Sequence, residues 1–407
     1  MSTTSREAPG PTTPGQPQAA DALLNSEQIL ANAKAVAARV RNADLAARYD
    51  ELRQLPADIV EQLRTAGIMR MSMPRHWGGP EITSMDQVLV IEELAKADAS
   101  VAWCSAIWCD SGLYSGYLDD PVAREMYPRL DMATSGWVYP VGRATRVDGG
   151  YRVTGHWIFG SGANHCDWLA AGCLVQSVDG APSSDPLDLW RIMLAPRSSY
   201  EILDTWYTTG LRGTGSNDYR CDDLFVPDEH SFSFLAPATR AGPLWARPDA
   251  LLRKMAGIPL GVAADALAVA RETMGTKADR VLGLPYREMP RVQSVIAEQH
   301  AALAAARSYV FSSLATQWAK LETGAPLTVE ERADVWLART NAFQTARRVV
   351  TALYDLVGGS AVYSRKSPFD RHLRDTQTMC QHIVAQTKGW EAVGSLLLGV
   401  DTVQPLL

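Results

Sequence analysis

A serine between two glycines, Ser161, is the first residue whose type and setting suit chemistry. It ends an alternating run that begins at Tyr151, and period-two alternation predicts a strand there. If this strand is unbroken, Trp157, Phe159 and Ser161 share one face. The flanking glycines place nothing bulky beside the hydroxyl, so a flat ligand can lie against the backbone. We therefore predict a ligand-binding strand end whose aromatic face finishes in a hydroxyl.

A histidine near the C-terminus, His382, is the second candidate. Its side chain has an ordinary pKa of about 6.5, so it can hold or relay a proton at neutral pH. Helical spacing predicts a last helix from about Asp375 to Leu398. On that helix Asp375, Met379 and His382 fall on one face, which points the histidine the same way as the carboxylate.

Cysteine spacing, charge and missing motifs argue against several other classes. The six cysteines form no CxxC pair and no paired spacing with histidine, which argues against a zinc site, any other metal site or a disulfide scaffold. We expect buried thiols in a cytoplasmic protein. With a net charge of −6, no dense Lys/Arg run and no membrane-length apolar run, neither nucleic acid nor a membrane is an expected partner. Neither a G-x-G-x-x-G motif nor a P-loop motif occurs, so neither a Rossmann nicotinamide site nor a P-loop nucleotide site is expected. The expected ligand is a small molecule.

The elements that must position these residues change character twice along the chain. Apolar residues at helical spacing begin at Ser26 and continue to about residue 130. Four alternating runs then predict strands at Tyr151–Phe159, Trp168–Val175, Arg191–Ala195 and Asp218–Val226. Helical spacing returns at Leu251. Thr328 and Glu331 predict a capping box for a later helix, which Gly358 and Gly359 end.

Segregated helices and strands of this kind predict an α+β fold. We expect a flexible tail at 1–21, an N-terminal helical domain at 22–132, a central β domain at 133–235 and a C-terminal helical bundle at 236–407. A hydrophobic fraction of 46% is enough for a large core.

Six stretches in a fixed order carry a resemblance that covers nearly everything after residue 25. They are GIMRMSMPRHWGG, ASVAW, GHWIFGSGANHCDW, GLRGTGSNDYRCDDLFVP, ADRVLGLPYREMPRVQSVIAEQHAALAAAR and GGSAVYSRKSPFDRHLRDTQTMCQH. In this order they resemble the acyl-CoA dehydrogenase superfamily and, more closely, the flavin-dependent monooxygenases that share its fold. The resemblance implies an N-terminal helical domain, a central β-barrel or sandwich and a C-terminal four-helix bundle.

The residues after Arg374 and Asp375 favour the hydroxylase branch, the two-component group D type. A dehydrogenase needs a carboxylate to take a proton alpha to a thioester, whereas this sequence continues to Met379, Cys380 and His382. The resemblance implies an oxygenase component that receives reduced FMN or FAD from a separate NAD(P)H-dependent flavin reductase. It implies that O2 reacts at C4a of the flavin and that the hydroperoxide transfers one oxygen atom to an aromatic or polycyclic small molecule.

The resemblance also implies roles for particular residues. Ser161 and His382 would flank the isoalloxazine ring as catalytic residues, in an apolar pocket that keeps water away. Contacts with the flavin are expected from Trp157, Phe159, Ser161, Arg212, Ser216, Arg280, Gly358 and Gly359. The substrate wall is expected to include Trp103, Trp108 and His165. Without the resemblance, the same tryptophans are ordinary core residues, Ser161 is a turn serine and His382 is a histidine on the surface of a helix.

Three alternatives stay open at this stage. The same scaffold hosts N-hydroxylases that act on amines or amino sugars. A true acyl-CoA dehydrogenase would take its base from among Glu272, Asp355, Asp370 and Asp375. A helical partner protein that binds no flavin is the third. The family also implies a homodimer or homotetramer.

Overall fold

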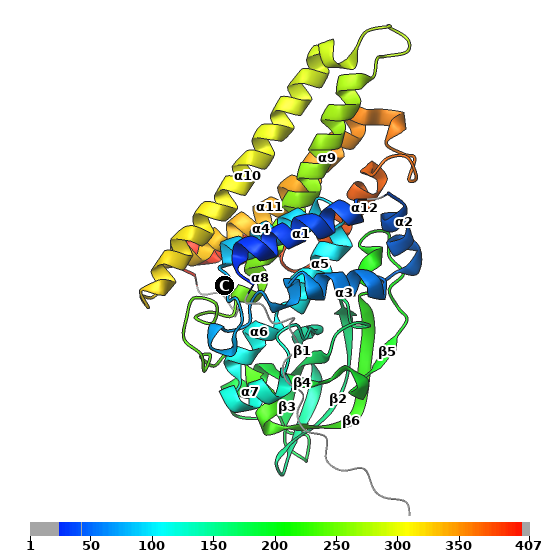
Figure 1. Cartoon of the computed structure of the whole chain (residues 1–407). Coiled ribbons are helices and arrows are strands. Elements are labelled where there is room, and N and C mark those ends of the chain that lie inside the picture. The colour runs from blue at the N-terminus through cyan, green and yellow to red at the C-terminus, as the bar shows by residue number, and fades with distance from the viewer. Residues whose placement is uncertain (1–23, 42, 401–407) are drawn as a thin grey trace, which may run out of the picture.

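The computed structural model describes residues 24–41 and 43–400, so the predicted tail at 1–21 lies outside the described residues. Helices come first, strands follow and helices return, which confirms the α+β prediction. Figure 1 shows the sheet at one end of the molecule, the N-terminal helices packed above it, and two long C-terminal helices that extend away at the other end.

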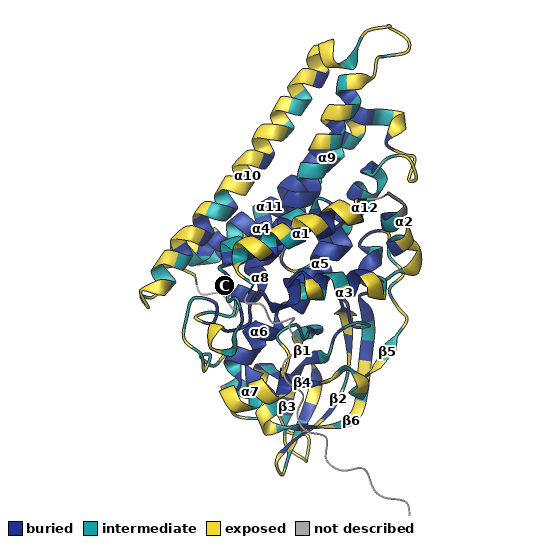
Figure 2. Cartoon of the chain, viewed as in Figure 1, coloured by how far each residue is buried: buried dark blue, intermediate teal, exposed yellow. Residues whose placement is uncertain are grey.

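Among the N-terminal helices, α5 (Ala99–Trp108) is buried almost throughout, whereas α1 (Ser26–Val40) has one buried and one exposed face (Figure 2). Asn25 and Gln28 form a capping box at the start of the first helix, each accepting a 2.9 Å hydrogen bond from the backbone amide of the other. The predicted apolar stripe of that helix is buried. The helices are α1 (Ser26–Val40), α2 (Ala43–Leu52), α3 (Ala57–Thr65), α4 (Ser84–Ala95), α5 (Ala99–Trp108), α6 (Ser111–Tyr114) and α7 (Asp120–Met126).

The described strands form one mixed sheet in the order β5-β6-β2-β1-β3-β4-β7. All neighbouring pairs are antiparallel except β1 and β3, which run parallel. The register of β1 against β3 shifts between Trp137 and Gly142, which bends this long strand. The strands are β1 (Thr134–Val147), β2 (Gly150–Gly160), β3 (Trp168–Gln176), β4 (Arg191–Pro196), β5 (Glu201–Leu203), β6 (Asn217–Pro227) and β7 (Ser231–Ser233).

The C-terminal helices pack around α11. Thr328 and Glu331 form the predicted capping box at its start, and the helix ends at Gly358, whose φ of 63° a residue with a side chain rarely adopts. The helices are α8 (Ala250–Arg253), α9 (Gly257–Thr276), α10 (Pro290–Glu322), α11 (Val329–Val357), α12 (Phe369–Met379) and α13 (Lys388–Leu397).

The last helix differs from the prediction of one element from Asp375 to Leu398. It is two helices, α12 and α13, joined by turns over residues 380–387. The predicted shared helical face of Asp375, Met379 and His382 is therefore wrong, because α12 ends at Met379 and His382 lies in the turn. This break carries the histidine out of the helix and toward the sheet.

Two expectations about the whole chain can be compared with the described residues. Five of the six free cysteines are buried and Cys221 is half-buried, close to the prediction of buried thiols. None of the described helices combines the length and the apolar character that a membrane crossing requires.

Candidate active site

A cavity of about 1010 Å³ lies between the sheet, α5 and the turn that joins α12 to α13. This volume is at the upper limit of the roughly 300–1,000 Å³ of small-molecule sites, so it has room for more than one ring system. Aromatic side chains dominate its walls: Trp103, Trp137, Tyr139, Phe159, Trp206, Tyr207 and Trp336. Of the described residues that line it, none carries a carboxylate.

Ser161 contributes a hydroxyl to this cavity, and its hydrogen bonds fix the direction of its proton. The indole Nε1 of Trp103 donates to Ser161 Oγ over 3.1 Å. Ser161 Oγ and Ser216 Oγ are 2.8 Å apart, and Ser216 Oγ and Thr214 Oγ1 are 2.6 Å apart. Thr214 Oγ1 must donate to the carbonyl oxygen of Leu211 at 2.8 Å, because a carbonyl only accepts.

The direction of each hydroxyl follows from that fixed end. The Thr214 hydroxyl donates its one proton to the Leu211 carbonyl, so Thr214 Oγ1 accepts a hydrogen bond from the Ser216 hydroxyl. Ser216 Oγ in turn accepts a hydrogen bond from the Ser161 hydroxyl. The proton of Ser161 is therefore directed to Ser216, and one remaining lone pair of the Ser161 oxygen is free for a ligand. Ser161 is presented as a hydrogen-bond acceptor that suits an N–H or O–H group.

His382 faces the same cavity from the turn after α12. Its ring packs edge-on against Trp103 and Trp137, with centroid distances of 5.2 and 6.4 Å. The backbone amide of Val384 donates to His382 Nδ1 over 3.3 Å, so the neutral ring carries its proton on Nε2. Burial away from water, together with the nearby Arg339 cation, lowers the pKa of His382 to about 4. The imidazole is neutral at pH 7.

We predict that the imidazole of His382 titrates with a midpoint near pH 4 instead of about 6.5, which side-chain NMR of a histidine-labelled protein measures directly. The unfolded chain takes up this proton first, so the free energy of unfolding falls as the pH drops from about 6.5 to about 4. A midpoint at or above 6.5 would contradict the buried, neutral state of the ring.

The predicted shared face of Trp157, Phe159 and Ser161 is wrong. Phe159 adopts a φ of 60°, and the register of β2 against β6 shifts between Trp157 and Gly160. This bulge turns Phe159 into the cavity, where it packs against Trp137 and Trp206. Trp157 points into the core instead, fully buried and outside the cavity lining.

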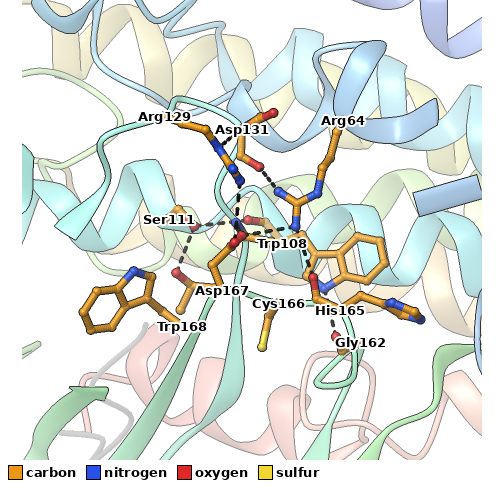
Figure 3. Close-up of polar contacts among 12 residues, drawn as sticks. Arg64, Trp108, Ser111, Arg129, Asp131, Gly162, His165, Cys166, Asp167 and Trp168 are labelled. Atoms are coloured by element: carbon orange, nitrogen blue, oxygen red, sulfur yellow. Dashed lines mark hydrogen bonds and ion pairs between the residues drawn. The ribbon is translucent and has the colours of Figure 1, made fainter. Parts of the chain in front are cut away.

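Trp108 and His165 also lie outside the cavity lining, in a network that supports the turn after Ser161 (Figure 3). Trp108 Nε1 donates to the Gly162 carbonyl over 3.2 Å, and His165 Nε2 is 2.7 Å from the Leu55 carbonyl. Arg64 from α3 donates to the His165 carbonyl at 3.2 Å. The structure therefore does not support the predicted substrate-wall role of Trp108 and His165, because both side chains form hydrogen bonds with backbone carbonyl groups outside the cavity.

Three further predicted flavin contacts lie away from the cavity. Arg280 is exposed in the loop between α9 and α10, and Gly358 and Gly359 lie at the end of α11. These two loops are joined by a 3.3 Å hydrogen bond from Lys277 Nζ to Ser360 Oγ, at the far end of the helices from the sheet (Figure 1). Within one chain they do not reach the site of Ser161.

Arg212 and Ser216, predicted from one motif, separate in space. Ser216 lines the cavity, whereas Arg212 donates to the carbonyls of Asp50 and Thr208, both at 3.0 Å. Arg212 thereby fixes the rim segment that precedes it. The cavity thus unites five of the predicted site residues: Trp103, Phe159, Ser161, Ser216 and His382.

Sequence analysis missed several lining residues. Trp137 and Tyr139 lie at the bend of β1, and Trp206 and Tyr207 lie in the loop after β5. Gln377 and Gln381 reach the cavity from α12 and the turn beyond it. The aromatic pair in the loop after β5 was the available signal, because loops often carry the residues of binding sites.

Asp375 connects α12 to the rim of the cavity without lining it. Its Oδ1 accepts a 2.7 Å hydrogen bond from the backbone amide of Leu211. Burial, with Asp98 and Asp50 nearby, raises the pKa of Asp375 to about 7. The carboxylate therefore holds the loop whose Leu211 carbonyl also ends the hydroxyl chain from Ser161.

Comparison with known proteins agrees with this architecture. The model of the acyl-CoA dehydrogenase N-terminal domain matches residues 25–120, and that of the C-terminal domain matches residues 254–387. Together the two models span more than half of the chain. The chain belongs to the acyl-CoA dehydrogenase family.

Relatives of this chain include proteins named as oxygenases. The indole-3-acetate monooxygenase of Acinetobacter baumannii is 29% identical over 86% of this chain and 88% of its own length. The oxygenase component of the FADH2-dependent resorcinol hydroxylase of a Rhizobium species is 28% identical over 86% of this chain and 89% of its own length. The crystal structure of the HsaA monooxygenase from M. tuberculosis superposes with a TM-score of 0.86 at 25% identity, covering 94% of this chain and all of that one. The acyl-CoA dehydrogenase family member described here is thus a flavin-dependent monooxygenase.

Proposed function

We propose that this protein is the oxygenase component of a two-component system that hydroxylates an aromatic or polycyclic small molecule. Reduced FMN or FAD would come from a separate NAD(P)H-dependent flavin reductase. The observation that carries the proposal is the cavity that joins the Ser161 hydroxyl to a neutral His382, has aromatic walls and is lined by no carboxylate among the described residues. The names of the relatives support the aromatic substrate and the separate reductase.

The residues around Ser161 fit a reduced flavin. The ring of a reduced flavin carries an N–H at N5, which is a donor, whereas the same atom of the oxidised ring is an acceptor. Ser161 is presented as an acceptor by the chain of hydroxyls that ends at Leu211, so it favours the reduced ring. Phe159 and Trp137 offer flat apolar surfaces beside it.

The aromatic walls of the cavity also suit a reaction from which water must be excluded. A reduced flavin held beside Ser161, Phe159 and Trp137 would supply the two electrons that the reaction with O2 needs, so that one oxygen atom could leave in the product and the other in water. Trp103, Trp137 and Trp206 keep water from that centre. His382 Nε2 carries a proton at neutral pH, so the imidazole can share this proton with an oxygen atom in the cavity and recover it on the same nitrogen.

The positions of the candidate carboxylates argue against the dehydrogenase alternative. Glu272 and Asp355 are exposed, and Asp370 pairs with Arg374 at 3.0 Å. The Asp375 carboxylate accepts a hydrogen bond from the Leu211 backbone amide. None of these four lines the cavity, so proton abstraction from an acyl thioester has no base there.

Anaerobic mixing with reduced flavin, followed by oxygen, tests the proposal. We expect a long-lived absorbance band of a flavin–oxygen adduct in stopped-flow spectra, because the pocket excludes water. The matched comparison is an acyl-CoA substrate mixed with oxidised flavin, which should not bleach the flavin. Immediate reoxidation without an adduct, or reduction of flavin by an acyl-CoA, would contradict the proposal.

We predict that Ser216→Ala narrows the preference for reduced over oxidised flavin. The change removes the group to which Ser161 donates, so the Ser161 proton becomes free to meet the unprotonated N5 of the oxidised ring. Loss of this orientation, worth about 1 kcal/mol, should lower the ratio of the two affinities about fivefold. Fluorescence titration with each redox form of FMN measures the ratio, and Ser111→Ala, which removes a buried hydroxyl elsewhere, is the control. An unchanged ratio would contradict the assigned direction of the hydroxyls.

A further inference from the structure

A second, small cavity lies behind the wall of the first. It is enclosed by α10, α11 and the segment before α8, with a volume of about 10 Å³, which is room for one water molecule or one small ion. Trp336 lines both cavities and separates them. The small cavity is polar, since Arg339, Asp249 and Gln317 contribute to its wall.

Arg339 on α11 is the unusual residue of this cavity. Its side chain is 2% exposed, and none of its three guanidinium nitrogens has a hydrogen-bond partner among the described residues. The face of Trp336 lies 4.4 Å from the guanidinium carbon, which shields the cation further. Burial lowers the pKa of Arg339 to about 10, so the side chain still carries its charge at neutral pH. A buried cation of this kind needs a counter-charge.

The Asp249 carboxylate is near enough to raise the pKa of Arg339, but it forms no hydrogen bond with the Arg339 guanidinium. Arg253 donates to both of its oxygens, at 3.0 and 2.7 Å, and Gln317 donates to one of them at 3.2 Å. Arg247 is a further 3.9 Å neighbour of the same carboxylate. The negative charge of Asp249 is therefore already compensated by two other arginines, Arg253 and Arg247. A water molecule in the cavity would satisfy hydrogen bonds but would leave the positive charge in place.

We propose that the small cavity is a binding site for one small monovalent inorganic anion of the halide type, held by the guanidinium of Arg339. The cavity has the size of one such ion, and the guanidinium supplies unpaired N–H donors together with the charge. The amide nitrogen of Gln317 borders the cavity and is already bound to Asp249, so Arg339 is the principal ligand. This site is separate from the flavin and substrate cavity and does not depend on the activity proposed above.

Bromide and chloride test this site on the full chain. Crystals grown in bromide should show an anomalous-scattering peak beside the Arg339 guanidinium. Replacing gluconate by chloride at equal ionic strength should raise Tm by about 2–4 °C, because the folded state alone binds the ion. Gluconate is the matched anion because it is too large for a cavity of this volume.

Two arginine variants complete the experiment. Arg339→Met should remove the difference between chloride and gluconate, whereas Arg291→Met, which removes an exposed charge from α10, should keep it. If Arg339→Met does not fold, the presence or absence of the bromide peak in the unaltered protein shows whether the cavity binds an anion. A cavity without anomalous density, together with equal Tm values in chloride and gluconate, would overturn the proposal and assign the space to water.

Discussion

His382→Ala is expected to lower hydroxylation by a factor of about 10²–10⁴ while oxidation of the reduced flavin continues with release of hydrogen peroxide. The titratable side chains that line the described cavity are those of His382, Lys388, Tyr139 and Tyr207, and the neutral imidazole of His382 is the one that pairs a nitrogen carrying a proton with a nitrogen that accepts a hydrogen bond. The aromatic walls and Ser161 stay in place, so flavin binding should change little. The measurement is product formed and peroxide released per flavin oxidised.

A matched histidine variant separates the role of this site from a general effect. His300→Ala removes an exposed histidine on α10 and should leave both yields unchanged. His382→Asn keeps a polar side chain of similar size but no titratable proton, so it should fail as His382→Ala does. Full coupling of flavin oxidation to hydroxylation in His382→Ala would remove the histidine from the proposed mechanism.

Trp157→Ala is expected to cost about 3–5 kcal/mol in the free energy of unfolding without a direct effect on the cavity. The indole is fully buried, stacks on Tyr219 with centroids 5.4 Å apart, and donates from Nε1 to the Gly172 carbonyl over 2.8 Å. Gly142 and Gly155 make room for it, since a Cβ at either position would lie under 3 Å from the ring. Denaturant unfolding measures the cost.

Phe159→Ala is the matched change two residues away. Its ring is 44% exposed and borders the cavity, so its loss should affect the unfolding free energy far less and should weaken reduced-flavin or substrate binding. The two variants are therefore expected to show opposite patterns. Lost ligand affinity in Trp157→Ala with normal stability, and the reverse in Phe159→Ala, would contradict the bulge in β2.

Strand parity explains where sequence analysis of the site succeeds and where it fails. Alternation correctly places Val153 and Trp157 on one face of β2, and both side chains are buried on that face. The left-handed Phe159 then breaks the period, and no residue type in the motif signals it, because the glycines stand on the far side of the bulge. A pattern argument that assumes one uninterrupted strand cannot place a side chain beyond such a break.

The C-terminal part of the site shows a similar limit. Arg374 and Asp375 mark the right neighbourhood, and His382 does reach the cavity, but a continuous helix would have placed it differently. The break after Met379 is a tertiary effect. The following turn packs its buried Val384 into the core, and Gln344 of α11 donates to the Ala385 carbonyl over 2.6 Å. Local propensity does not contain these contacts.

The hydrogen-bond partners of Ser161 could not be predicted from the sequence for a different reason, which is their distance along the chain. The acceptor state of Ser161 depends on Trp103, which is 58 residues away, and on Ser216, which is 55 residues away. Each residue was singled out from its own motif, yet the hydrogen bonds between them arise only when α5 and β6 meet β2. Fold class and candidate residues therefore follow from sequence patterns and resemblance, whereas the direction of each proton requires the structure.

Turnover under ¹⁸O2 with reduced FMN or FAD, and with indole-3-acetate or resorcinol as probe substrates, shows whether this cavity is a monooxygenase site. We expect a hydroxylated product that carries one ¹⁸O atom, formed by the unaltered protein and lost in His382→Ala. Mass spectrometry of the product measures the label. A hydroxylated product whose oxygen comes from water, or an equal yield of labelled product from His382→Ala, would contradict the assignment of this cavity as a monooxygenase site.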